Sequence, residues 1–180
     1  MEIPGPLAPP GNYRVSLAKR VNGQLSDLGL SQAFEVKPLR ERGLAGAAPD
    51  EVTAFAAQLD HLSRQVTGAD AAVEELLVET GAIKETLLRS GAAIGLRDQA
   101  RSIELELLQI QQKINGNEAR ALYGDPGPVS INGRLNAAMM GTFRSTYGPT
   151  ETHSKSFEIA AKDFNEIADS IRQITDVRMP

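Results

Sequence analysis

The sequence contains no cysteine and no tryptophan, and only 4% of its 180 residues are aromatic. The lack of cysteine excludes disulfides, thiolate catalysis and cysteine-rich zinc sites, although it does not exclude export. Scarce aromatic rings disfavour a small-molecule pocket or a base-stacking surface, because both rely on such rings. The same scarcity is normal in a helical bundle packed with Leu, Ile, Val and Ala.

Clustered positive charge and long apolar runs are also missing. The net charge is −4, and Lys and Arg are scattered singly among acidic residues. Binding to nucleic acid is therefore not expected, since it needs a clustered basic surface. No apolar run approaches the roughly 18 residues of a membrane span, and no signal-peptide pattern follows Met1. The chain itself assigns no localisation.

The sequence offers no pattern for metal, cofactor or nucleophilic chemistry. His61 and His153 are the only histidines, and neither has a second ligand three or four residues further on. No nucleophile elbow or phosphate-binding loop is present. Paired carboxylates, which we expect on solvated helix faces, occur as Glu74 with Glu75, Glu79 with Glu85, and Glu104 with Glu106. We predict no catalytic residue, cofactor or metal ligand, and this chain alone is not expected to be an enzyme.

The strongest pattern is an apolar seam that predicts one long helix. Proline is absent from Asp50 to Asp125, which permits long helices. Within this stretch apolar residues recur in steps of three and four, interrupted only by Thr80, at Val52, Phe55, Leu59, Leu62, Val66, Ala69, Val73, Leu76, Ile83 and Leu87. The phase continues through Gly68 and Gly81, so we predict a single helix over 49–90, with a kink near Gly68 as the main risk.

Further seams predict three more helices. Gly91–Gly95 forms a turn, and a second helix carries Leu96, Ala100, Ile103, Leu107, Ile110 and Ile114 and ends near Leu122. Ser130 caps a short third helix that ends near Tyr147, and Thr150 or Thr152 caps a fourth, with a seam from Phe157 to Val177. The predicted fold is mainly α, an antiparallel up-down bundle of four helices (long, long, short, long) over 49–178.

The segment before the bundle predicts a β-hairpin over 1–40, followed by a linker over 41–48. Apolar and polar residues alternate from Tyr13 to Val21, Asn22-Gly23 is a favoured hairpin turn, and Phe34 with Val36 marks a second strand. An isolated hairpin is marginal in water. Its strands pack on the helices, pair with another chain, or form the edge of a sheet whose other strands are missing, and we favour the last alternative.

Polar residues flank the loop between the second and third helices. The weak candidates for a binding site are Asn117, Arg120, Asn132, Arg134 and Asn136. Such side chains hold loops by bonding free backbone groups at helix ends, and they also bind sugars or carboxylates. We favour the structural role.

Two parts of the chain resemble a known family. The run Pro10–Leu17, Asn22-Gly23 and Gln32–Val36 resembles the end of an immunoglobulin-like or fibronectin-like β-sandwich. The rest of the chain is similar to the C-terminal helical region of bacterial sortilin-like or BNR-repeat glycosyl hydrolases. The segments that carry this similarity are Pro128–Asn136 and the helix start at Pro149-Thr150. The longer connection between the strands, Lys19 to Ser31, departs from that pattern and puts the hairpin register in doubt.

The resemblance implies an exported parent protein with an N-terminal propeller and sandwich that are missing from this chain. In that family the propeller would bear any glycosidase activity, and no propeller repeat occurs here, so no catalytic residue carries over. The leading hypothesis is a non-catalytic C-terminal module that serves packing or partner binding. The alternatives are a wall of a glycan-hydrolase site completed by the propeller, or a free-standing interaction protein.

Two structural observations separate these hypotheses. Unpaired strand edges at Tyr13 to Leu17 would favour the packing module or the free-standing interaction protein, because an open edge accepts a further strand. A deep pocket lined by Glu, Asn and Arg near the loop after the second helix would favour the glycan site.

Overall fold

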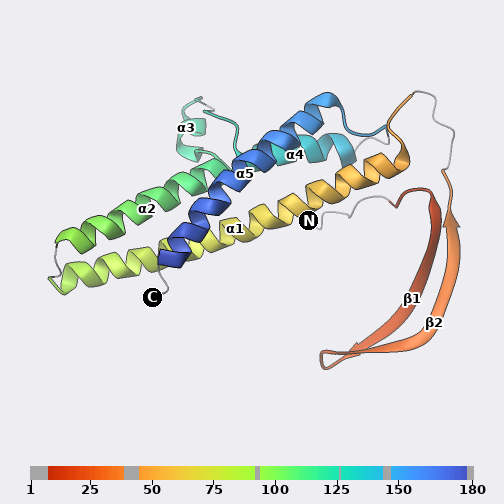
Figure 1. Cartoon of the computed structure of the whole chain (residues 1–180), viewed down its shortest axis with the longest axis horizontal. Coiled ribbons are helices and arrows are strands. Elements are labelled where there is room, and N and C mark those ends of the chain that lie inside the picture. Colours follow the sequence, from red (N-terminus) through yellow and green to blue (C-terminus); the bar gives the residue numbers. More distant parts are fainter. Residues whose placement is uncertain (1–7, 39–44, 92–93, 126, 144–146, 178–180) are drawn as a thin grey trace.

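The computed structural model describes residues 8–38, 45–91, 94–125, 127–143 and 147–177. Two strands form a hairpin that stands beside a set of packed helices (Figure 1). The elements are β1 (Gly11–Val21), β2 (Gln24–Val36), α1 (Pro49–Arg89), α2 (Ile94–Asn115), α3 (Glu118–Leu122), α4 (Ile131–Phe143) and α5 (Glu151–Val177). The predicted class, a mainly helical bundle preceded by a hairpin, is confirmed.

Helix α1 is continuous, as predicted, and passes Gly68 and Gly81 without interruption. At its start the Ala48 N–H donates to the Glu51 carboxylate at 3.0 Å, which satisfies a free donor of the first turn. Thr80, the one polar interruption of the seam, is buried, and its hydroxyl donates to the Leu76 carbonyl at 2.7 Å. Thr80 thus fills a buried position of the seam, whereas Ile83, the next apolar residue of the pattern, is 44% exposed.

Helix α1 is the central helix of the bundle. Helix α2 returns along the C-terminal half of α1, while α4 and α5 pack on each other and against α1 and α2 (Figure 1). Long, long, short and long helices follow one another as expected. The most deeply buried large side chains come from all four, namely Leu59, Val66, Val73, Leu107, Ile114, Ile131 and Ile167.

The second helix ends earlier than predicted. Helix α2 stops at Asn115 because Gly116 has a φ of +88°, a left-handed conformation that glycine adopts without steric cost. A separate helix, α3, follows, and the Asn117 side chain caps it by accepting from the Arg120 N–H at 3.0 Å. The prediction of one helix to about Leu122 is therefore wrong.

The caps of the last two helices follow the sequence. Ser130 Oγ accepts from the Gly133 N–H at 3.1 Å, and Thr150 Oγ1 accepts from the His153 N–H at 3.4 Å. Thr150, not Thr152, is therefore the cap of α5. The predicted end of the third helix falls beside residues 144–146, outside the described residues. So do the outer bounds of the predicted hairpin (1–7 and 39–40), most of the linker (41–44), part of the first turn (92–93) and the bundle end at 178.

The second strand of the hairpin, β2, is longer than expected. Asn22 (φ +49°) and Gly23 (φ +82°) both adopt positive φ, as a type I′ turn requires, and β1 pairs with β2 from that turn to Gly11↔Val36. The expected long connection, Lys19 to Ser31, is wrong, because those residues lie in the ladder, with Leu28 and Gly29 as a bulge.

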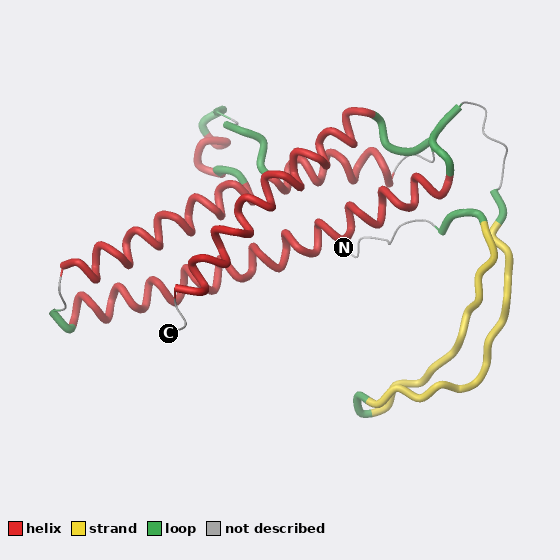
Figure 2. Tube along the Cα trace, viewed as in Figure 1, coloured by secondary structure: helices red, strands yellow, loops and turns green. Residues whose placement is uncertain are grey.

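The hairpin does not pack on the bundle. Among the described residues neither strand contacts any helix, and the tube in Figure 2 shows the two strands curving away from the helical part. The alternative in which the strands pack on the helices is therefore excluded for the described part of the chain.

Candidate functional site

The hairpin carries one apolar and one polar face. Residues paired across the ladder share a face, so the register Tyr13↔Phe34 and Leu17↔Leu30 gathers apolar side chains on one side, with Val15 opposite the polar Gln32. We call this side the apolar face, and it consists of Tyr13, Val15, Leu17, Leu30, Phe34 and Val36, together with Gln32. The polar face carries Asn12, Arg14, Ser16, Ser31, Ala33 and Glu35.

The apolar face is uncovered. The exposed fractions are 49% for Val15, 54% for Leu17, 59% for Leu30 and 48% for Phe34. Aromatic contacts occur at the end of the hairpin opposite its turn. There the rings of Tyr13 and Phe34 stack with centroids 5.8 Å apart, and the Tyr13 hydroxyl donates to the Pro9 carbonyl at 2.7 Å. Exposed apolar patches on folded chains often belong to interaction sites, so this face is a candidate for one.

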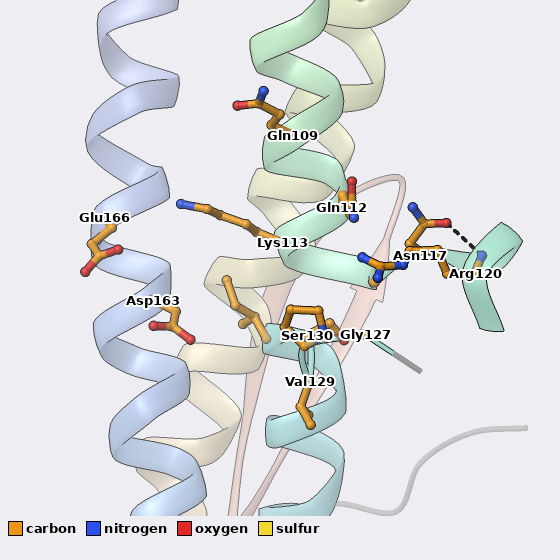
Figure 3. Close-up of a pocket in the computed structure, with 13 residues that line it drawn as sticks. Gln109, Gln112, Lys113, Asn117, Arg120, Gly127, Val129, Ser130, Asp163 and Glu166 are labelled. Atoms are coloured by element: carbon orange, nitrogen blue, oxygen red, sulfur yellow. Dashed lines mark hydrogen bonds between the residues drawn. The ribbon is translucent and has the colours of Figure 1, made fainter. Parts of the chain in front are cut away.

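A polar pocket lies in the helical part of the molecule, where the loop after α2 meets α4 and α5 (Figure 3). Its volume is about 430 Å³. Helix α2 contributes Gln109, Gln112 and Lys113, and Lys113 extends toward α5, which carries Asp163 and Glu166 (Figure 3). The remaining lining residues are Gly116, Asn117, Arg120, Gly127, Pro128, Val129, Ser130 and Ile131.

The pocket brings together only two of the five polar residues singled out from the sequence, Asn117 and Arg120. Both also hold the loop. Arg120 donates from Nε and Nη2 to the Asp125 carboxylate at 2.9 and 2.6 Å, and Asn117 caps α3. Lys113, Asp163 and Glu166 were missed, because each looks like an ordinary solvated helix residue until α2 and α5 are placed side by side.

Asn132 joins three helices instead of lining the pocket. Its amide donates to Asn115 Oδ1 at 2.8 Å, and the Asn115 amide donates to Asp70 Oδ1 at 2.8 Å. This ladder connects α4 to α2 and α2 to α1. It supports the structural interpretation of the polar loop residues, and the part played by Asp70 could not be predicted from the sequence.

The other two candidates lie apart from the pocket. Arg134 is partly buried on α4, and its Nε has no hydrogen-bond partner among the described residues. Asn136 is exposed on the same helix. Neither is among the residues that line the pocket with Asn117 and Arg120.

The described ranges contain no group of three or more His, Asp or Glu side chains that could hold a metal ion. No helix in those ranges has the length and apolar character to span a membrane. No protein family, curated protein or solved structure matches this chain.

Proposed function

We propose that this chain is a non-catalytic helical module of a larger propeller-containing protein, and that it docks on a neighbouring β-domain through the hairpin. The observation that carries the proposal is the uncovered apolar face. A two-stranded hairpin has too little buried surface to be stable alone in water. Covering about half of each side chain such as Leu17, Leu30 or Phe34 would contribute about 1 kcal/mol per residue.

The resemblance to the end of a β-sandwich supplies the chemistry of the neighbour. A sandwich core forms when the apolar faces of two sheets pack together about 10 Å apart. The apolar face of the hairpin has the alternation that such packing needs, because its other side is polar. The helical bundle has its own buried core and serves as a spacer or cap on that domain.

Comparison of this chain with the full-length product of its gene tests the proposal. A Leu30→Cys thiol should react freely with maleimide in this chain, which has no other cysteine, and should be shielded in the full-length product. An equal rate in both proteins would overturn the docking role, as would a full-length product no longer than this chain. The matched control is Leu25→Cys on the other side of the hairpin, which is 73% exposed and should react in both.

A second function, a wall of a glycan-hydrolase site, is favoured by the polar pocket. Its volume lies within the range of small-ligand sites, and Asn117, Arg120 and Glu166 line it. The proposal stays second because Asp163 and Glu166 lie one turn apart on one helix, whereas glycosidase carboxylates face each other across the scissile bond. Hydrolysis of chromogenic glycosides by the full-length gene product, lost in Glu166→Gln, would reverse that order.

A further inference from the structure

The two outer edges of the hairpin differ in regularity. Strand β1 runs from Gly11 to Val21 with no extra residue, whereas the partner strand contains the bulge at Leu28 and Gly29. Gly29 has a φ of +66°, and its N–H donates to the Asp27 carboxylate at 2.9 Å. A bulge breaks the row of backbone groups on its strand and protects that edge from further pairing. The outer edge of β1 is therefore the open one.

The two strands also differ in charge. Strand β1 carries Arg14, Lys19 and Arg20 and no acid, whereas β2 carries Asp27 and Glu35 and no base. None of the three cations is in an ion pair within the described part of the chain. Pairing β1 with β1 of a second copy would gather six cations on two adjacent strands, which disfavours that dimer, whereas opposite charges on neighbouring strands stabilise a sheet.

We infer that β1 is the strand through which the hairpin joins its neighbour, and that its partner is a β-strand with acidic side chains beside Arg14 and Arg20. This inference rests on the proposed docking role. It adds which strand edge pairs with the neighbour and which charge the neighbouring strand carries. The occupant is the edge strand of the neighbouring β-domain in the same polypeptide.

The ladder identifies the backbone groups that would pair. In a two-residue hairpin the residues next to the turn, Val21 and Gln24, bond to each other, and successive N–H groups then alternate in direction. The N–H groups of Arg14, Ser16 and Arg20 therefore point away from β2. Ser31 lies opposite Ser16 in the register, and its N–H points away from β1. Ser16 and Ser31 thus report on the two outer edges at the same level of the hairpin.

Residue-resolved hydrogen exchange on the full-length gene product tests the inference directly. The amides of Arg14, Ser16 and Arg20 should exchange at least about tenfold more slowly there than in this chain alone. The Ser31 amide should exchange at the same rate in both. Protection of Ser31 without protection of Ser16 would overturn the inference, because the neighbour would then pair with β2.

The maleimide readout separates this failure from failure of the docking role. If the Leu30→Cys thiol is shielded but the amides of neither outer edge are protected from exchange, the apolar face is docked and the assignment of β1 as the pairing edge is overturned. A reactive thiol in the full-length product overturns both. Light scattering of this chain adds a third outcome. If the chain is a dimer and its β1 amides are protected, the strand that pairs with β1 belongs to a second copy, and the inference is overturned.

Matched substitutions test the edge and the charge. Ser16→Pro removes an outer donor of β1 and Ser31→Pro removes the equivalent donor of β2, so only the first should release the Leu30→Cys thiol in the full-length product. Arg20→Glu should raise thiol reactivity about three- to tenfold, since a like-charge pair replaces an opposite one. Arg101→Glu makes the same charge change on an exposed side chain of α2 and should leave the rate unchanged. Equal effects of the two proline substitutions, or of the two charge substitutions, would contradict the assignment of β1 as the pairing edge.

Discussion

The polar side chains around the loop after α2 bond mainly to one another and to backbone groups. Asn117 caps α3, Arg120 binds Asp125, and Asn132 reaches Asn115. The first bond satisfies a backbone N–H at the start of a helix, and the other two join exposed side chains on either side of the loop. These residues thus fix the path of the loop, and the pocket beside them is a consequence of that path.

The ladder from Asp70 through Asn115 to Asn132 gives a residue-scale prediction. Asn115→Ala removes both bonds, and we expect a loss of about 1 kcal/mol in the free energy of unfolding, because the bonds are exposed to competing water. Urea denaturation followed by circular dichroism measures this. Asn136→Ala is the matched control, since Asn136 is exposed on α4, and its effect should stay within about 0.5 kcal/mol. A larger loss for Asn136→Ala would contradict the assignment.

A second residue-scale prediction concerns the contact between Gly141 of α4 and His153 of α5. A Cβ added at Gly141 would lie 1.9 Å from Cε1 of the imidazole, whose Nδ1 accepts from the Thr150 N–H at 3.2 Å. Gly141→Ala should therefore destabilise the fold by about 1 kcal/mol, the cost of overpacking less the gain in helix propensity.

The double variant identifies the cause. In a His153→Ala background the imidazole is gone, so Gly141→Ala should stabilise the protein by about 0.5–1 kcal/mol through helix propensity alone. Thermal denaturation of the four proteins gives the coupling between the two sites. The same sign in both backgrounds would show that the histidine does not occupy the space beside Gly141.

At the scale of whole elements, two glycines with the same local signal behave differently. Gly68 lies inside α1, and a Cβ there would meet no atom within 4 Å. Gly116 ends α2 with a φ of +88°. Gly68→Ala should therefore stabilise α1 by about 0.5–1 kcal/mol, whereas Gly116→Ala should cost about 1–2 kcal/mol because alanine is strained at positive φ. Chemical denaturation measures both, and a loss on Gly68→Ala would indicate a kink there.

The hydrophobic period was enough to predict the elements but not their contacts. The seam through Leu59, Val66 and Val73 predicted α1, since its phase continued past Gly68. The same reasoning extended the predicted second helix beyond Gly116, where the observed helix ends. Periodicity indicates which face of a helix is buried and not the φ angle of one residue. The second strand was underestimated, since the three leucines of Gln24 to Ser31 do not alternate regularly with its polar residues and its pairing depends on the turn at Asn22-Gly23.

The candidate site was predictable only in part. Asn117 and Arg120 lie close in sequence, so a polar loop could be recognised. Lys113 and Asp163 lie on helices that are far apart along the chain, and their approach depends on how α2 and α5 pack. The apolar face of the hairpin follows from alternation, but its exposure depends on the absence of contact between the hairpin and the bundle.

For the whole molecule, the separation of hairpin and bundle predicts that they are energetically independent. No strand contacts a helix in the described residues, and the start of α1 is held by the bundle itself, where the Ala47 N–H donates to the Tyr147 carbonyl at 2.9 Å. Removal of residues 1–38 should therefore leave the helical circular dichroism and the free energy of unfolding of the bundle unchanged within about 0.5 kcal/mol.

A core substitution measured in both chains makes this test sharper. Ile167→Ala, at a side chain only 1% exposed, should cost about 2–5 kcal/mol through the cavity that it leaves. The cost should be the same with and without residues 1–38, because substitutions at sites that share no partner add. A smaller cost in the shortened chain would mean that the bundle has already lost packing on removal of residues 1–38. The hairpin would then stabilise the bundle instead of offering a surface to another sheet.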